Sequence, residues 1–385
     1  MNAWTRSEKI AALALGAAVV STVCTAMMVP ELRRLFRLRP SVAESEPKST
    51  GDGTEALIAA AGNRYSGKIA FISNRSGGHS EIFAINADGT DLHSITKFSP
   101  ADKYDGGVNT IAISLDGKQL AFSGGMSLTG RGDIWTINTD GSNLRNLTQG
   151  SGLNVYPQWS PDASRIAFLC QRDLKEYLCI MNADGSDFRT LARAQISYPG
   201  SAPAWAPSGR QIAFLDENGR VTIAVVAGSE LSSTCKMLDS YSRYPVWKPD
   251  GSSVAFPANG DIYIGNADCS NVLNLTNDSS DHNWNLSWSP DGRRIAFDSQ
   301  RDGETHIFAI DITTSEITKL TDDSAPDSEP SWSPDGTQII FYRGVKEDNR
   351  YIMNKEVWIM FSDGTGQRNL SNNPAWDRLG QWFPQ

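Results

Sequence analysis

The sequence contains little of what most enzymes use for catalysis. It has four histidines and five cysteines among 385 residues. It has no Gly-x-Ser-x-Gly, His-Glu-x-x-His, Cys-x-x-Cys or phosphate-binding loop motif, which argues against the common nucleophilic, zinc-dependent and nucleotide-dependent enzymes. The histidines are scattered along the chain at His79, His93, His282 and His306. We predict no catalytic residue, no metal ion and no cofactor.

Long uncharged segments are also scarce, and residues 10–29 are the exception, with 20 residues free of charge. At about 1.5 Å rise per residue, a helix of this length spans a hydrocarbon core of about 30 Å. We predict a short basic N-terminus at 1–9, a transmembrane helix or signal anchor at 10–29, and a basic, then flexible, linker at 30–64. A cleaved signal peptide is the alternative, because Arg6 and Lys9 precede the run and small residues surround Cys24. Lipid attachment at Cys24 is the third interpretation.

Positive charge is concentrated in the first forty residues. They carry six basic and two acidic side chains, a net charge of +4, which leaves −13 on the remainder. Because a surface with this much negative charge repels phosphate backbones, we predict no nucleic-acid partner. We expect a partner that is basic or neutral. Arg33, Arg34, Arg37 and Arg39 follow the uncharged run. The positive-inside tendency would therefore place the rest of the chain in the cytoplasm.

What the sequence does contain is one short unit repeated along its length. A version of Trp-Ser-Pro-Asp-Gly begins at Ile113, Trp159, Trp205, Trp247, Trp288 and Trp332. The spacings of 41 to 46 residues fall in the range expected of propeller blades. Each copy continues with an Ile-Ala-Phe-like run and a second apolar and aromatic run, and most then add a tight turn and a Leu-Thr ending. The unit predicts a four-stranded antiparallel blade.

The ends of the repeat array indicate how it closes. There are seven Ile-Ala-Phe-like runs, but the first, at 69–71, has no Trp-containing strand in front of it. The missing strand is found at 379–384, which contains Trp382. Pairing it with the first unit would close a ring and remove free sheet edges. We predict an all-β fold: a monomeric seven-bladed β-propeller at 65–385, closed by the C-terminal strand and preceded by one N-terminal transmembrane helix.

The order of these motifs resembles the TolB-like and tricorn-type WD-like β-propeller family, over nearly all of residues 65–385. TolB proteins place an α/β domain before the propeller, and the segment between residue 29 and the first blade is too short for one. Tricorn-type and prolyl-peptidase relatives add a catalytic domain after the propeller, whereas this chain stops at Gln385. The resemblance implies an extracytoplasmic propeller. We follow it over the arginine count and predict a single-pass membrane protein with a periplasmic or cell-surface ring.

Two apparent functional motifs are better explained by the repeat. Arg131-Gly132-Asp133 resembles an adhesion tripeptide, but Asp133 is the acid that recurs before the third strand, as at Asp261 and Glu356. The Asp of Trp-Ser-Pro-Asp-Gly also recurs in most blades, and repeated identical active sites are implausible. We predict that this Asp caps a turn.

Four cysteines, Cys170, Cys179, Cys235 and Cys269, lie outside the uncharged segment. Cys170 and Cys179 are one hairpin apart, so a disulfide between them is one interpretation in an oxidising compartment. We favour the other, that both are unpaired core residues replacing a serine and an aromatic residue of other blades. Cys269 occupies a turn position where other blades have Gly, and the sequence offers no reason for it.

Residues that depart from a repeat are the best candidates for function on a repetitive scaffold. Those four to six positions before each Trp should lie near one mouth of the central channel, and Trp and Arg often dominate binding energy. We predict that the following residues bind a protein or glycan partner: Asn154, Arg243, His282, Asn283, Trp284, Asp327, Trp376, Asp377 and Arg378.

These features predict a membrane-anchored, non-catalytic interaction scaffold. The alternative is a propeller hydrolase or polysaccharide lyase with a metal ion or an acid–base group at the channel mouth. In that case Asp327, Asp377 and His282 would converge there.

Overall fold

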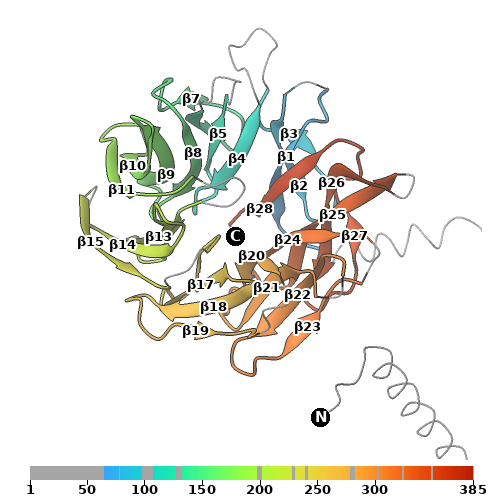
Figure 1. The fold of residues 1–385 in the computed structure, drawn as a ribbon. Coiled ribbons are helices and arrows are strands. Elements are labelled where there is room, and N and C mark those ends of the chain that lie inside the picture. The colour runs from blue at the N-terminus through green and yellow to red at the C-terminus, as the bar shows by residue number, and fades with distance from the viewer. Residues whose placement is uncertain are drawn as a thin grey trace, which may run out of the picture. The chain divides into compact units, whose positions relative to one another are not determined.

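The computed structural model describes residues 65–77, 79–97, 107–125, 132–196, 202–227, 230–238, 242–277, 282–301, 303–322, 325–347 and 350–384. The chain divides into two compact units, Met1–Glu55 and Ala56–Gln385. In the second unit, seven four-stranded antiparallel sheets surround a central axis (Figure 1). The predicted seven-bladed propeller is confirmed. The predicted helix at 10–29 lies outside the described residues, among which no helix is long and apolar enough to cross a membrane.

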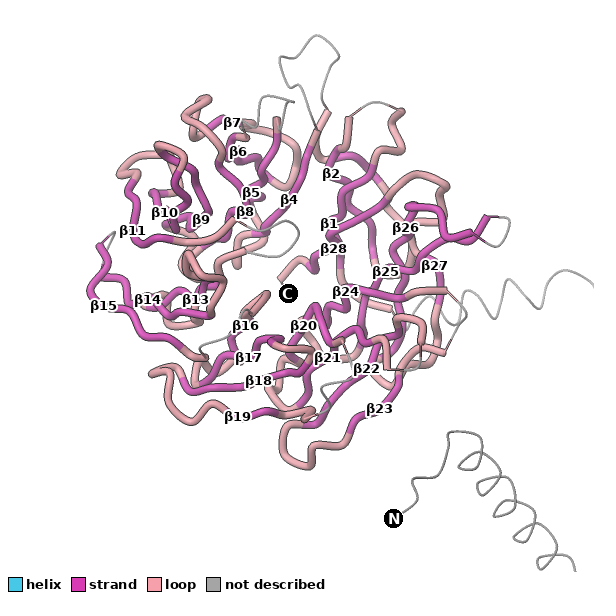
Figure 2. The backbone as a smooth tube through the Cα atoms, in the orientation of Figure 1, coloured by secondary structure: helices cyan, strands magenta, loops and turns pink. Residues whose placement is uncertain are grey.

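Every blade has four strands, counted outward from the axis (Figure 2). The inner strands of blades 1 to 7 are β28 (Asp377–Trp382), β4 (Val108–Ile113), β8 (Asn154–Trp159), β12 (Ala204–Trp205), β16 (Val246–Trp247), β20 (Asn283–Trp288) and β24 (Asp327–Trp332). The second strands are β1 (Lys68–Ser73), β5 (Gln119–Gly124), β9 (Arg165–Arg172), β13 (Gln211–Leu215), β17 (Ser253–Ala258), β21 (Arg294–Ser299) and β25 (Gln338–Glu347). The third strands are β2 (Glu81–Asn86), β6 (Asp133–Asn138), β10 (Lys175–Asn182), β14 (Val221–Ala227), β18 (Asp261–Asn266), β22 (His306–Asp311) and β26 (Arg350–Phe361). The outer strands are β3 (His93–Ser94), β7 (Arg145–Asn146), β11 (Arg189–Arg193), β15 (Glu230–Lys236), β19 (Leu273–Asn274), β23 (Ile317–Lys319) and β27 (Arg368–Asn369).

The ring closes as the sequence predicts. Strand β28 from the C-terminal end pairs antiparallel with β1, with Trp382 opposite Ile69 and Asp377 opposite Ser73. Blade 1 therefore combines strands from the two ends of the described chain, and β28 lies beside β1 in Figure 1. This pairing leaves no blade without an inner strand.

The recurring Trp links one blade to the next. The indole N–H of Trp247 donates a hydrogen bond to the Ala204 carbonyl of the preceding blade at 2.9 Å, and Trp382 donates to Ser331 at 3.1 Å. Blade 2 has Ile113 in place of Trp. There the Gln381 side chain of blade 1 bridges instead, accepting from the Ile113 N–H at 3.2 Å. The repeat Trp thus supplies apolar area in each of these blades, and in four of them, at Trp205, Trp247, Trp288 and Trp382, an inter-blade hydrogen bond as well.

The Ile-Ala-Phe-like runs form the packed core. One phenylalanine per blade is fully buried, namely Phe71, Phe122, Phe168, Phe214, Phe256, Phe297 and Phe341. Each aromatic side chain of this kind buries about 150–250 Å². Packing these rings between adjacent sheets accounts for the repeat of apolar residues in the sequence.

The aspartate of Trp-Ser-Pro-Asp-Gly caps a turn, as predicted. In blade 3, Asp162 accepts hydrogen bonds from the Ser160 hydroxyl at 2.6 Å and the Ser164 N–H at 3.1 Å. These bonds, with the Ser160 hydroxyl first among them, lower the pKa of Asp162 to about 2. Asp133 likewise bonds within its own blade, accepting from the Thr148 hydroxyl at 2.7 Å.

The structure overturns the interpretation of Cys170 and Cys179 as unpaired core residues. Both are fully buried, and they form a disulfide with a Cα–Cα distance of 6.0 Å. In the β9–β10 register Cys170 faces Tyr177 and Cys179 faces Phe168, so the two cysteines are diagonal neighbours across the strand pair. That separation suits a disulfide.

A second disulfide accounts for Cys269. It joins Cys269, in the turn after β18 of blade 5, to Cys235 on β15 of blade 4, with a Cα–Cα distance of 6.1 Å. Cys269 has a φ of 64°, the left-handed conformation that Gly adopts at the matching turn position of Gly89. An L-residue pays about 1–2 kcal/mol for this conformation. The covalent link between blades explains why a cysteine is found there.

Candidate functional site

A buried arginine holds the first residue of the inner strand in blade 7. The Arg343 Nε and Nη2 atoms donate hydrogen bonds to the two carboxylate oxygens of Asp327 at 2.7 and 3.0 Å. The guanidinium lies 4.3 Å from the ring centroid of Trp358 and also donates to Gln367. Burial raises the pKa of Asp327 although Arg343 acts to lower it, so desolvation outweighs the attraction of the arginine.

In three other blades an arginine likewise binds an Asp or Asn at the start of the inner strand, and we call this arrangement the Arg clamp. The partners are Arg75 and Asp377 at 3.1 Å in blade 1, Arg172 and Asn154 at 2.9 Å in blade 3, and Arg301 and Asn283 at 3.2 Å in blade 6. In each case the arginine also stacks on an aromatic ring of its blade or outer loop. The clamp therefore ties an inner strand to the aromatic residues farther out.

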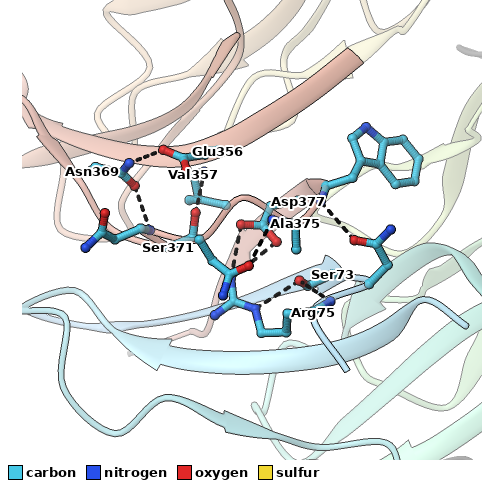
Figure 3. A network of polar contacts seen from close by, with 12 residues as sticks. Ser73, Arg75, Glu356, Val357, Asn369, Ser371, Ala375 and Asp377 are labelled. Carbon is cyan, nitrogen blue, oxygen red and sulfur yellow. Dashed lines mark hydrogen bonds and ion pairs between the residues drawn. The ribbon is translucent and has the colours of Figure 1, made fainter. Parts of the chain in front are cut away.

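Figure 3 shows the clamp of blade 1 and its contact with blade 7. Arg75 binds Asp377 and also donates from Nε to the Ser73 hydroxyl at 2.9 Å. Ser371, beyond β27 of blade 7, accepts from the Val357 N–H at 3.0 Å and donates to Asp377. Burial raises the pKa of Asp377 here as well. This network connects blade 1 to blade 7 at the point where the ring closes.

These contacts change the account of four predicted partner-binding residues. Asn154, Asn283, Asp327 and Asp377 are at most 1% exposed. A partner cannot touch them directly, and we correct their assignment to structural residues of the Arg clamp.

The three residues of the catalytic alternative lie in different surroundings. Asp327 and Asp377 are each held by an arginine of their own blade, whereas His282 is exposed. Among the described residues, no group of three or more His, Cys, Asp and Glu side chains could hold a metal ion. His306, the first residue of β22, is buried.

The other five predicted residues are accessible, and we call them the rim: Arg243, His282, Trp284, Trp376 and Arg378. They contribute two aromatic platforms on different blades. The rings of His282 and Trp284 lie 5.4 Å apart, and the Arg378 guanidinium lies 4.3 Å from the centroid of Trp376. Arg378 is also fixed to the Val108 carbonyl at 2.9 Å.

The central channel opens at its other end among the Trp-Ser-Pro turns, and we call that end the turn mouth. The channel forms a cavity of about 1150 Å³. One residue from the same repeat position of every blade lines it: Leu115, Pro161, Pro207, Pro249, Pro290, Pro334 and Pro384. The described chain enters the ring on this side, because Ser66 contacts Asp335 and Gln338 of a Trp-Ser-Pro turn.

Inside the channel, the backbone of several inner strands is bulged. Opposite Phe168, Phe297 and Phe341, two inner-strand residues face a single residue of the second strand. The first bulged residue is left-handed in each case, with φ of 57° at Tyr156, 48° at Asn285 and 56° at Glu329. This backbone conformation raises the free energy of a non-glycine residue, and residues that adopt it are often found at functional sites. Asn285 and Glu329 line the channel.

A buried carboxylate lies behind these two residues. Asp298 is 2% exposed, and its Oδ2 accepts from the Asn285 side chain at 2.8 Å and the Glu329 N–H at 3.3 Å. Burial raises the pKa of Asp298 to about 6, and the nearby charge of Glu329 adds to the effect. Burial, with the charges of Glu329 and Asp298 among the smaller causes, also raises the pKa of Tyr244. Three adjacent blades thus supply one acidic site in the channel wall.

The Asp298 carboxyl makes a testable contribution to stability. Its pKa is raised from 3.8 to about 6 in the folded state, so the native state retains a proton that the unfolded state loses in that window. Stability from this group is fully present below about pH 4 and is lost as pH rises through about 6. Relative to wild type, D298N should therefore gain about 3 kcal/mol between pH 4 and pH 8. Urea unfolding across that range measures it, and parallel pH curves for the two proteins would contradict it.

The sequence prediction missed Asp298, Asn285, Glu329 and Tyr244, although two signals were present. The position after the second-strand phenylalanine is apolar in several blades, as at Ile72 and Leu169, and Asp298 breaks that pattern. Asn285, Glu329 and Tyr244 all lie three residues before a repeat Trp. A comparison of the blades column by column would have identified them.

Comparisons with known proteins agree with this architecture. The family model described as "TolB beta propeller domain" matches residues 101–260 and 175–380, which together exceed half of the chain. The chain is 26% identical over 294 residues to uncharacterized protein Atu1656 of Agrobacterium fabrum, covering 69% of this chain and 94% of that protein. It is 28% identical over 171 residues to uncharacterized peptidase YuxL of Bacillus subtilis, covering 43% of this chain but only 24% of that protein.

Solved structures share the fold. TolB from Acinetobacter baumannii superposes with a TM-score of 0.54 at 21% identity, covering 83% of this chain and 67% of that one. An oligogalacturonate lyase in complex with manganese gives 0.54 at 13% identity, covering 80% and 86%. At these identities the likeness is one of fold alone. The family match and the seven closed blades together place this chain in the TolB β-propeller domain family.

Proposed function

We propose that the protein is a non-catalytic interaction scaffold, held at a membrane surface by residues 10–29, whose propeller binds a protein or glycan partner through the rim. The observation that carries the proposal is the pair of accessible aromatic platforms in the rim, His282 with Trp284 and Arg378 with Trp376. The described chain begins at the turn mouth, where Ser66 contacts Asp335, whereas the rim lies at the opposite ends of the inner strands.

The chemistry of the rim supports this assignment. Trp284 and Trp376 are partly exposed, and each contacts a neighbouring polar side chain: the His282 ring is tilted against Trp284, and the Arg378 guanidinium lies over the Trp376 ring. Ordered aromatic and arginine side chains lose little entropy on binding and are enriched among residues that dominate binding energy.

We further propose an extracytoplasmic location. All four cysteines of the described residues are paired, in two disulfides. Disulfides persist in oxidising compartments and are rare in the cytosol. The two disulfides favour this location independently of the four arginines that follow the uncharged segment.

Photo-crosslinking in intact cells tests the rim. A photoreactive residue at position 284 or 376 should capture the partner, whereas one at 115, on the turn mouth, should not. With the captured partner purified, Trp284→Ala should weaken its binding about 30-fold, the effect of losing about 2 kcal/mol. Leu115→Ala, which truncates a side chain that is 62% exposed, is the matched control and should leave the affinity unchanged. Crosslinks from position 115 alone would assign the partner to the turn mouth and overturn the proposal.

An enzyme with its acid–base group in the channel is the second candidate. One observation favours it, namely the position of the buried Asp298 against the channel-lining residues Asn285 and Glu329, where burial raises its pKa to about 6, a value suited to general acid–base chemistry near neutral pH. Incubation of the full chain with polyuronates and with peptides, followed by chromatography of the products, tests this candidate. Product formation lost in D298N would support the enzyme, and unchanged substrates would leave the scaffold as the better account.

A further inference from the structure

Asp298 is a charged residue at a position of the repeat that is apolar in the three preceding blades. The residue after the second-strand phenylalanine is Leu169 in blade 3, Leu215 in blade 4 and Pro257 in blade 5. Blade 6 places a carboxylate there at 2% exposure. Burying an ionised carboxylate without a cation costs free energy, so a structural role alone gives no reason for an Asp at a position where other blades have an apolar residue.

Half of this carboxylate is unsatisfied. Oδ2 of Asp298 is bound by Asn285 and by the Glu329 N–H, whereas Oδ1 is buried and has no hydrogen-bond partner among the described residues. Both residues that contact Oδ2 line the channel and have left-handed backbones. The free oxygen therefore lies directly behind a strained segment of the channel wall.

The local charges leave one negative charge unbalanced. Glu329 is paired with Lys355, whose Nζ lies 3.4 Å from Oε1 and also donates to the Ser328 hydroxyl at 3.1 Å. The same ammonium lies 6.0 Å from the ring centroid of Tyr342. Lys355 thus pairs with Glu329 and also acts on Asp298 through its charge, while Asp298 forms no ion pair of its own among the described residues. The set of Asp298, Glu329 and Lys355 carries a net charge of −1.

The surrounding groups suit an ammonium ion better than a metal ion. Asp298 Oδ1, the Glu329 carboxylate and the Asn285 side-chain oxygen offer three acceptors, which matches the three donors of a primary ammonium. Calcium requires six to eight oxygen ligands. Tyr244 also lines this cavity, and aromatic faces attract cations. Lys355 shows within this chain how an ammonium is held by Glu329 next to a tyrosine ring.

We propose that the channel wall between blades 6 and 7 binds a primary ammonium group between Asp298 and Glu329. The group is supplied either by a lysine side chain of a peptide or by a free alkylamine. This site lies next to the rim, because Asp298 is opposite Trp284 in the β20–β21 register, but it uses none of the five rim side chains and does not depend on the function proposed above.

Calorimetric titration of the full chain in detergent tests the site with defined probes. Methylammonium should bind at least tenfold more tightly than tetramethylammonium, which carries the same single positive charge but has no N–H donor. Acetyl-Ala-Lys-Ala-amide and cadaverine distinguish the sources: the tighter of the two identifies a peptide or a free amine. Equal binding of methylammonium and tetramethylammonium, or no binding of any amine, would overturn the proposal.

Variants make the test specific. D298N should weaken methylammonium binding at least tenfold, and D322N, which removes the same charge at a residue whose side chain is 95% exposed, should have no effect. K355M should strengthen binding several-fold, because it removes the internal competitor for Glu329. A purely structural Asp298 would not produce that gain. Weakened binding in K355M, or equal affinities for D298N and D322N, would contradict the proposal.

Discussion

Replacing Arg343 by methionine will destabilise the propeller by about 3–5 kcal/mol at pH 7, because it leaves a buried carboxylate without its cation. The substitution removes both hydrogen bonds to Asp327 and the stacking on Trp358, while methionine fills much of the same volume. Burial already raises the pKa of Asp327 in the presence of the arginine, and without it the carboxyl will take up a proton more readily. The loss should therefore be smaller at pH 5 than at pH 7. Urea unfolding at the two pH values measures both effects.

The chain supplies the control for this experiment. Blades 3 and 6 have asparagine where blade 7 has Asp327, and their arginines still bind it, at 2.9 Å in blade 3 and 3.2 Å in blade 6. Asp327→Asn should therefore keep the clamp and cost only about 1–2 kcal/mol. If Arg343→Met costs no more than Asp327→Asn, the buried charge is not what makes the arginine necessary.

The fold could be predicted because its information is local and repeated. A turn such as Trp159 to Ala163, and the apolar run that follows it, depend on neighbouring residues and recur at nearly constant spacing. Closure by the C-terminal strand followed from a count of one strand too few at the start. Each of these inferences needed only the pattern of residue types and the preference of sheets to hide their edges.

The site could not be predicted in the same way because the bulges change the direction of side chains. Asn154, Asn283, Asp327 and Asp377 all lie five residues before a repeat Trp. In a regular strand, a residue five positions from a buried Trp faces the opposite side, here the channel. The bulge inserts one extra residue between them, as between Val155 and Gln158, and returns the side chain to the buried side. Sequence alternation alone gives no sign of that insertion.

The same bulges bring other residues into the channel. Asn285 and Glu329 are themselves the bulged residues, and Asp298 is reached through them. Their identity varies from blade to blade while the backbone geometry is shared, so the scaffold keeps a constant shape around a variable set of side chains. That division is typical of repeat proteins, in which function resides in positions free to differ.

The inter-blade disulfide should show a reversal of sign with redox state. Cys235 and Cys269 are 34 residues apart, and closing a loop of that length is worth about 3–4 kcal/mol in the chain-entropy account. Cys269 also has a left-handed φ of 64°, which destabilises the folded state for a cysteine but not for a glycine. Cys269→Gly should therefore destabilise the oxidised protein by only about 2–3 kcal/mol and stabilise the reduced protein by about 1 kcal/mol, each relative to wild type in the same buffer.

Cys235→Ala separates the two contributions, because it removes the disulfide and leaves the backbone of Cys269 unchanged. It should cost the full 3–4 kcal/mol when oxidised and close to nothing when reduced. Urea unfolding of both variants with and without a thiol reductant gives the four values, and the Cys170–Cys179 disulfide, common to all of them, cancels in each comparison. Equal losses for the two variants in the oxidised state would mean that the turn imposes no strain on Cys269. Its presence where other blades have glycine would then rest on the disulfide alone.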